Sequence, residues 1–205
     1  MKLEIWYDHD TDSPNENGDW QLYSFNSRFS AYADPAKFIL PGPDGKPVPV
    51  NVGFARKLKV GTAFILSYFE HGNCVWGHQG ETPNCQWDTT KVAGVLVWEQ
   101  PAKNLGPKSY MDREKDARNY LEEYTDWANG QCFGYTLTDD DGTAKDSCGG
   151  FIGAKCLQET IANDWPDIFF DIENMVLKAD IELTGDTSGI MEQEQKERRS
   201  RKVTA

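Results

Sequence analysis

Residues 112–128 are the segment that most constrains the fold of this chain. Their apolar side chains recur at the i, i+3 and i+4 spacing of one helix face, while charged residues occupy the opposite face. The apolar residues of this face are Ala117, Tyr120, Leu121, Tyr124 and Trp127. Asn129-Gly130 then supplies a C-terminal stop. We therefore expect one long amphipathic helix that packs against a face of a sheet.

Short apolar runs typical of strands provide that sheet. Residues 92–98 (VAGVLVW) are the most apolar run and are expected at the centre of the sheet. Gly94 within this run suggests that another element approaches closely. Residues 2–8, 21–25 and 62–69 are further expected strands. The sequence thus predicts an α+β fold, with a mainly antiparallel sheet and one long amphipathic helix packed on it.

Proline and glycine mark the connections between these elements. Residues 40–51 (LPGPDGKPVPVN) hold four Pro and two Gly, which predicts a surface excursion, either a hairpin tip or a partner-binding arm. Residues 71–88 are expected to be irregular, and Asp141-Gly142 predicts a type I′ hairpin turn. Short helices are expected at residues 34–38 and 154–163. Residues 165–183 are expected to form another helix, although their apolar pattern fits a strand equally well.

The length of 205 residues allows one sizeable core or at most two small ones. We expect a single domain over residues 1–190. Residues 191–205 (MEQEQKERRSRKVTA) have no aromatic residue, three acids and five bases, which predicts a frayed, solvated tail. The alternative for this tail is a basic arm that contacts nucleic acid or an acidic partner.

Composition limits the compartment and the class of partner. The balance of 21 Lys+Arg against 33 Asp+Glu gives a net charge of −12, which argues against a general nucleic-acid binder. No apolar run is long enough for a membrane span, and the first residues, MKLEIWYDHD, lack the apolar core of a signal peptide. Five cysteines cannot all pair, so reduced thiols in a reducing cytoplasm are expected, with a Cys132–Cys148 bridge as the alternative.

The residues that best imitate a metal site follow the spacing His-x2-Cys-x3-His-x6-Cys. They are His71, Cys74, His78 and Cys85. Two imidazoles and two thiolates are a suitable tetrahedral set for zinc. However, the segment lacks a Cys-x2-Cys knuckle, which favours unrelated loop residues that lie beside packed tryptophans. We therefore expect no cofactor, with zinc as the candidate if an ion binds.

Aspartates cluster in two turn-rich segments. The first group is Asp8, Asp10, Asp12 and Asp19, and the second is Asp139, Asp140 and Asp141. The first group imitates a calcium loop, but Ser13 stands where the turn glycine belongs and Pro14 follows it. Asx turns that cap an acidic loop are the alternative. No Gly-x-Ser-x-Gly motif, Walker loop or dinucleotide fingerprint is present, and nothing marks one cysteine as an activated nucleophile beside His71 or His78.

Three stretches carry a resemblance to a known family. They are residues 7–14 after the first strand, residues 85–88 (CQWD) before the apolar strand, and residues 124–153 from the helix end through the Asp-Gly hairpin. They resemble a family of small, acidic, uncharacterised proteins carried by bacteriophages and plasmids. This chain departs from the family with Gly149-Gly150, where an aromatic-Gly pair is usual. The resemblance implies a mobile-element accessory protein and no particular reaction.

These observations lead to one expected function. We expect a non-enzymatic accessory protein that binds a host protein, as an acidic inhibitor of a defence or nucleic-acid-handling factor. The seven aspartates of the two groups would contact a basic groove of that partner. The alternatives are that the charge only provides solubility, that the protein is a metal-dependent enzyme, or that exposed aromatics and the basic tail bind single-stranded nucleic acid.

Overall fold

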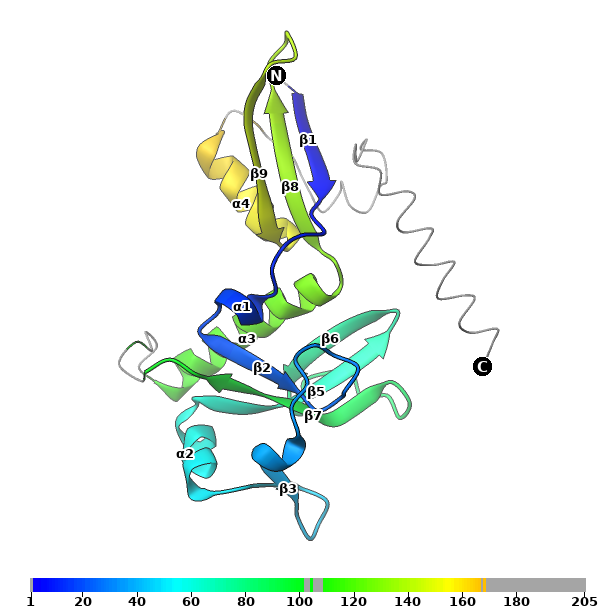
Figure 1. The fold of residues 1–205 in the computed structure, drawn as a ribbon, viewed down its shortest axis with the longest axis vertical. Helices are drawn as coiled ribbons and strands as arrows, with labels where there is room; N and C mark the ends of the chain where they lie inside the picture. The colour runs from blue at the N-terminus through cyan, green and yellow to red at the C-terminus, as the bar shows by residue number, and fades with distance from the viewer. Residues whose placement is uncertain (1, 102–103, 105–108, 167, 169–205) are drawn as a thin grey trace. The chain divides into compact units, whose positions relative to one another are not determined.

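The computed structural model describes residues 2–101, 104, 109–166 and 168 (Figure 1). Its strands form three antiparallel sheets accompanied by helices, which confirms the predicted α+β class. The chain divides into two compact units. The inserted unit is Asp12–Asn129, and the terminal unit combines Met1–Thr11 with Gly130–Ala205. The sequence instead predicts one domain over residues 1–190, and the predicted tail at 191–205 lies outside the described residues.

The inserted unit is built on a four-stranded sheet in the order β2-β7-β5-β6. Its strands are β2 (Trp20–Ser24), β5 (Ala63–His71), β6 (Asn73–His78) and β7 (Thr89–Trp98). The expected interior position of residues 92–98 is confirmed, because β7 pairs with both β2 and β5. The expectation of irregular structure over residues 71–88 is wrong at β6, where Cys74, Trp76 and His78 alternate as buried residues.

The predicted close approach at Gly94 is also confirmed. A Cβ atom at this position would lie 2.3 Å from the carbonyl oxygen of Tyr23 on the neighbouring strand β2. No side chain fits there without displacing backbone, so this pair of strands requires glycine.

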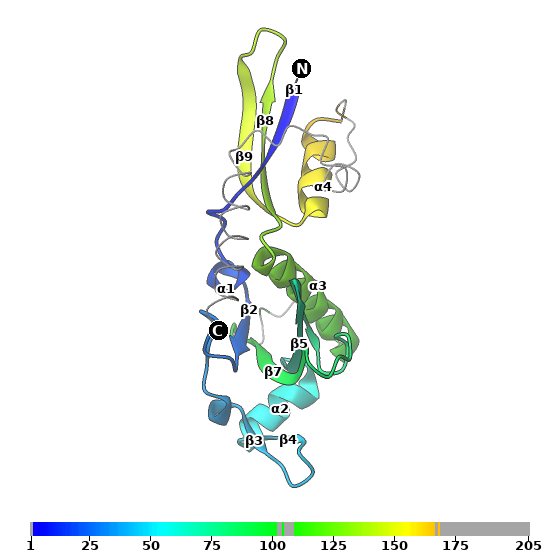
Figure 2. The ribbon, with the colours of Figure 1, turned by 90° about the vertical axis from the view of Figure 1, so that its right-hand side faces the viewer.

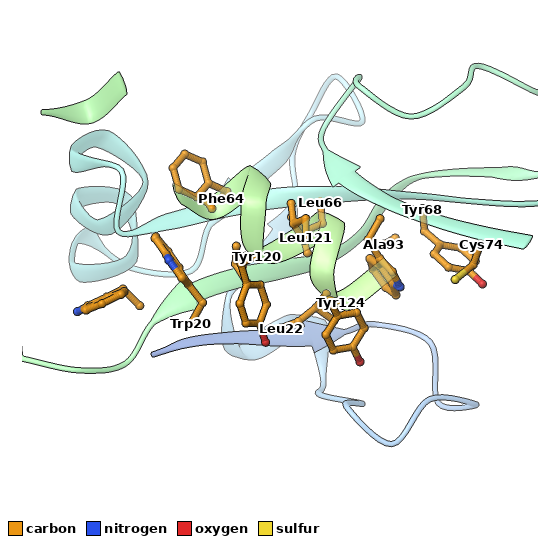
Figure 3. Close-up of a cluster of buried hydrophobic side chains, with 14 residues drawn as sticks. Trp20, Leu22, Phe64, Leu66, Tyr68, Cys74, Ala93, Tyr120, Leu121 and Tyr124 are labelled. Atoms are coloured by element: carbon orange, nitrogen blue, oxygen red, sulfur yellow. The ribbon is translucent and has the colours of Figure 1, made fainter. Parts of the chain in front are cut away.

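The expected amphipathic helix is α3 (Tyr110–Ala128). Ser109 and Asp112 form a capping box at its start, and Asn129 caps its end. Its buried face consists of Ala117, Tyr120, Leu121 and Tyr124, with Trp127 packed beside them. Figure 3 shows Tyr120, Leu121 and Tyr124 of this face against the sheet. The sheet residues labelled there include Trp20, Leu22, Phe64, Leu66 and Ala93.

The opposite face of the same sheet is covered by a helix that our sequence analysis missed. This helix, α2 (Val52–Val60), begins at the N-cap Asn51 and ends at Gly61, which has a φ of +73°. It packs with the hairpin of β3 (Ile39–Pro41) and β4 (Pro47–Pro49), which confirms a hairpin in the proline-rich segment. The core on this face contains Ile39, Phe54, Ala63, Val95 and Val97. Figure 2 shows α3 and α2 on opposite sides of the sheet.

The described part of the inserted unit also contains two short helical turns. The expected turn at residues 34–38 is the 3-10 helix η1 (Pro35–Lys37), capped by the side chain of Asp34. The acidic loop after the first strand is more ordered than expected, because it contains α1 (Pro14–Asn17). Ser13 caps α1 and Pro14 occupies its first position, where a missing N–H has no cost.

The described part of the terminal unit consists of a three-stranded sheet and one helix. The strands β1 (Lys2–Tyr7), β8 (Cys132–Thr138) and β9 (Ala144–Ile152) have the order β1-β8-β9. The helix α4 (Ala154–Asp164) lies along one face of this sheet (Figure 2). The core between them consists of Ile5, Phe133, Tyr135, Leu157 and Ile161.

The turn between β8 and β9 differs from the predicted two-residue type I′ turn. The N–H of Asp139 donates to the carbonyl oxygen of Thr143 at 3.0 Å, which leaves a loop over residues 140–142. Gly142 still supplies the positive φ that the pattern indicates, at +86°. The register places Cys132 opposite Ile152 and Cys148 opposite Tyr135, so a Cys132–Cys148 bridge is not formed. Most of the ambiguous segment 165–183 lies outside the described residues.

Candidate functional site

The structure does not bring the four predicted zinc ligands together. His71 pairs with Asn73 beside the β5–β6 turn, whereas His78 pairs with Leu66 at the far end of the hairpin. Five residues of strand separate these positions, which is roughly 17 Å. Because no single ion reaches both imidazoles, His71, Cys74, His78 and Cys85 do not form one ligand set. Cys74 and His78 are buried, while His71 is exposed.

His71 and Cys85 instead meet at Asp88, which our sequence analysis did not single out. One carboxylate oxygen, Oδ2 of Asp88, lies 3.1 Å from Nδ1 of His71 and 3.3 Å from Sγ of Cys85. The thiol therefore faces a carboxylate and not an imidazole base. This is not the arrangement that activates a cysteine nucleophile, in which the base contacts the thiol directly.

His78 is the most unusual polar side chain of the inserted unit. Its ring stacks on Phe64, with centroids 4.5 Å apart and an interplanar angle of 12°, and its side chain is only 8% exposed. Neither ring nitrogen has a hydrogen-bond partner among the described residues. Burial lowers the pKa of His78, so the imidazole is neutral at physiological pH.

Two glutamates and an arginine lie beside this histidine. Nδ1 of His78 is 3.8 Å from Oε2 of Glu81, and Nη2 of Arg118 is 2.6 Å from Oε1 of Glu81. Arg118 also pairs with Glu114 at 3.2 Å, and its hydrogen bonds lower the pKa of Glu81. Ligand atoms of His78, Glu81 and Glu114 lie within 4.8 Å of one another. Among the described residues this is the one group of three such side chains close enough to share an ion.

Of these three residues, only His78 is among the site residues predicted from the sequence. Glu81 follows His78 by three residues in the turn after β6, and that short spacing is a local signal. Glu114 is on α3, and no sequence pattern connects it to His78. The tertiary contact of α3 with β6 brings these residues together.

The first aspartate group is divided between the two units. Asp8 and Asp10 belong to the terminal unit, whereas Asp12 and Asp19 lie on either side of α1 in the inserted unit. The Asp8 carboxylate accepts hydrogen bonds from the N–H of Asp10 at 3.1 Å and of Gly150 at 2.7 Å. It thus ties the end of β1 to β9.

The second aspartate group is at the tip of the β8–β9 hairpin. Asp139 accepts hydrogen bonds from the N–H groups of Asp141 and Thr143 and pairs with Lys145 at 2.8 Å. The contacts with Asp141 and Lys145 hold the pKa of Asp139 well below its usual value. These bonds order the turn itself.

The two aspartate groups of the terminal unit lie at opposite ends of its sheet. Asp139 follows Thr138, which pairs with Lys2, whereas Asp8 follows Tyr7, which pairs with Phe133. The length of β1, roughly 20 Å, therefore separates them. These two described groups of aspartates therefore do not converge on one spot.

Exposed apolar side chains of the inserted unit, by contrast, are concentrated on a few of its elements. Nine large apolar side chains of the described residues are exposed, and six of them belong to β3, β4, α2 and the first turn of α3. We call this set the α2 surface; its members are Leu40, Val48, Val52, Val60, Tyr110 and Met111. Leu40 and Val48 are paired across the hairpin, and the ring of Tyr110 lies against Gly61 at the end of α2.

Basic residues border the α2 surface although the whole chain is acidic. Arg56 and Lys59 are exposed on the face of α2 that carries Val52 and Val60, at the i+4 and i+7 positions from Val52. Lys46 is exposed on the hairpin beside them. The segment 34–61 contains five bases and two acids, against the net −12 of the chain.

Comparison with known proteins gives no relative. No protein-family model matches the chain, no curated protein matches it, and no solved structure matches it. The resemblance to phage and plasmid proteins therefore remains a prediction. Among the described residues, no helix combines the length and the apolar character needed to cross a membrane.

Proposed function

We propose that this protein acts by binding another protein through the α2 surface. The observation that carries the proposal is that six of the nine large apolar side chains exposed on the described residues belong to α2, to the β3–β4 hairpin and to the first turn of α3. Val52 is 86% exposed, although its helix is otherwise well anchored by Phe54. Contiguous apolar patches on a folded protein typically mark an interaction site.

The basic border indicates the chemistry of the partner. Arg56, Lys59 and Lys46 would face the rim of the contact, where charges set orientation and association rate. The apolar side chains would form its dry centre, from which charged residues are depleted. The partner is therefore a protein with an apolar surface surrounded by carboxylates. Following the resemblance, we take this partner to be a protein of the bacterial host, and this chain to be an accessory protein of a phage or plasmid.

The acidic contact expected from the sequence has weaker support. In that version the aspartates cover the basic groove of a host defence or nucleic-acid-handling factor. Asp8 accepts a hydrogen bond from Gly150 on β9, Asp139 accepts hydrogen bonds within its own turn, and the two lie at opposite ends of the sheet. Asp10, Asp12 and Asp19 still add to the negative field, which affects how fast partners associate.

The test is a quantitative affinity capture from bacterial lysate with matched variants. The contact variant is Leu40→Glu with Val52→Glu, which places two carboxylates on the α2 surface. The control is Trp87→Glu, because Trp87 is 87% exposed and lies outside that surface. The acidic variant is Asp12→Lys with Asp19→Lys. Such surface substitutions should change the free energy of unfolding by only about 0.5 kcal/mol per site.

The expected result is a protein captured by wild type, by the control and by the acidic variant, and lost from the contact variant. After purification, the captured protein should bind the contact variant at least tenfold more weakly than it binds wild type, as measured by titration. Capture that survives in the contact variant but fails in the acidic variant would favour the acidic inhibitor. Binding of wild type to anionic lipid vesicles, lost in the contact variant, would replace the protein partner with a lipid surface.

A further inference from the structure

We propose that His78, Glu81 and Glu114 form a binding site for a divalent transition-metal cation, with Zn²⁺ as the ion of highest affinity. The three side chains come from the end of β6, the turn that follows it and the first half of α3. Their ligand atoms lie within 4.8 Å of one another. This site is separate from the α2 surface and does not depend on the function proposed for that surface.

His78 is the observation that points to a ligand. Its side chain is more than nine-tenths buried, Phe64 covers one face of its ring, and neither nitrogen has a hydrogen-bond partner among the described residues. Buried polar groups are nearly always satisfied, so two unmet nitrogens on one imidazole need an explanation. A cation bound at Nδ1 would satisfy one of these two nitrogens.

The distance between His78 and Glu81 fits a shared ion better than a direct bond. Nδ1 of His78 and Oε2 of Glu81 are 3.8 Å apart, which is too long for a hydrogen bond. Two ligands of a tetrahedral zinc ion, each at its usual bond length, are roughly 3.3 Å apart. A shift of a few tenths of an ångström in an exposed carboxylate would therefore complete this pair.

Arg118 supplies the positive charge of the site when no ion is bound. Its guanidinium group lies 2.6 Å from Glu81 and 3.2 Å from Glu114, so it pairs with both carboxylates that would ligate the ion. The Arg118 side chain is 42% exposed and can move into solvent. The guanidinium and the metal ion thus compete for the same two carboxylates, which gives the proposal a distinctive prediction.

The ligand set also indicates which ions should bind. One imidazole and two carboxylates provide three protein ligands, which leaves a fourth position for water. Imidazole suits Zn²⁺ and Co²⁺, whereas Mg²⁺ and Ca²⁺ prefer oxygen ligands throughout. An acidic surface without a true site would instead bind all divalent cations with similar weakness.

The experiment is calorimetric titration of the chelator-treated full chain with Zn²⁺, Co²⁺ and Mg²⁺. We expect one Zn²⁺ per chain, a Co²⁺ complex with visible absorption, and much weaker Mg²⁺ binding. Glu114→Gln should weaken Zn²⁺ binding at least tenfold, and this partly exposed position is suited to a variant that keeps the fold. His78→Gln should do the same. Arg118→Gln should strengthen binding about tenfold, because the competing charge is gone.

His71→Gln is the matched control, since His71 is a histidine of the same hairpin outside the cluster. It should leave Zn²⁺ affinity unchanged. Weaker binding in His71→Gln together with full binding in Glu114→Gln would assign the ion to the His71–Asp88–Cys85 contact and overturn the proposal. Absence of stoichiometric Zn²⁺ binding in both wild type and Arg118→Gln would also overturn it.

Discussion

The two units of this protein cover an antiparallel sheet in different ways. In the inserted unit, α3 covers one face of the four-stranded sheet and α2 with the β3–β4 hairpin covers the other. In the terminal unit, α4 covers one face of the three-stranded sheet. The other face carries Trp6, whose ring lies over Gly134. A strand in a sheet that is buried on both faces has apolar residues at consecutive positions. This continuous run is why β7 could be recognised from the sequence.

The units also differ in how the chain builds them. The inserted unit is one continuous segment, Asp12–Asn129, whereas the terminal unit needs β1 from the start of the chain to pair with β8. Lys2 pairs with Thr138, so the whole inserted unit lies within the loop that this pairing closes. Closing a long unfolded loop costs more conformational entropy than closing a short or folded one. The terminal unit should therefore depend on the folding of the inserted unit, and the reverse dependence should be weaker.

The largest expected effect is that of Leu121→Asp in the inserted unit. Leu121 is 2% exposed in the α3 face, and an unpaired carboxylate there should cost several kcal/mol, a large share of the stability of a domain. We expect the inserted unit to unfold. The pairing of β1 with β8 would then have to close a long unfolded loop, so the terminal unit should be strongly destabilised as well. Hydrogen exchange should show lost protection in both units. Normal stability of this variant would show that the buried face of α3 is assigned incorrectly.

Leu157→Asp is the matching change in the terminal unit. Leu157 is fully buried between α4 and its sheet, so the local cost should be similar. Because the inserted unit is continuous, β7 and α3 should keep the hydrogen-exchange protection of wild type, while β1, β8 and β9 lose theirs. Equal loss of protection in both units would contradict the asymmetry argued from chain connectivity.

A smaller effect should separate two glycines, one in each unit. A Cβ at Gly94 would lie 2.3 Å from the backbone oxygen of Tyr23, and a Cβ at Gly134 would lie 2.3 Å from the ring of Trp6. The backbone of a paired strand cannot move away, but a side chain can rotate. Gly94→Ala should therefore cost about 2 kcal/mol and Gly134→Ala less, measured by urea unfolding.

The control for this pair is a double-mutant cycle. Trp6→Ala removes the obstacle at Gly134, so adding Gly134→Ala to that variant should cost little or nothing further. A cost for Gly134→Ala that persists without the Trp6 ring would show that backbone, and not the indole, excludes the methyl group.

The helices and strands that were predicted correctly are those with a clear local pattern in the sequence. The 3.6-residue period gave α3, the apolar run gave β7, and the alternation of the first residues gave β1. The missed helix α2 follows a proline-rich segment, although Asn51 and Gly61 are cap signals at its two ends. In β6, alternating Cys74, Trp76 and His78 were the signal, obscured by the glycines around them.

The candidate sites were harder to predict because they depend on register and tertiary contact. The spacing of His71, Cys74, His78 and Cys85 suggested one ion, but the hairpin register separates the two imidazoles. Glu114 reaches His78 only because α3 packs on β6, which no short spacing can indicate. The α2 surface likewise combines a hairpin, a helix and the start of a second helix.

The smallest expected effect is a change in the acid sensitivity of the terminal unit. Oδ2 of Asp146 accepts hydrogen bonds from the hydroxyl of Tyr135 at 2.5 Å and from the indole N–H of Trp165 at 3.3 Å. These bonds lower the pKa of Asp146 below its unfolded value of about 3.9. A lowered carboxyl pKa contributes stability above that unfolded value and loses it as pH falls through the folded pKa.

Asp146→Asn should therefore lower stability at pH 7 and flatten its decline below about pH 4. Urea unfolding across that range measures both effects, with exposed Asp10→Asn as the control in the same unit. If Asp146→Asn keeps the acid dependence of wild type, other carboxylates, such as Asp139 in its ion pair with Lys145, account for the acid sensitivity of this unit.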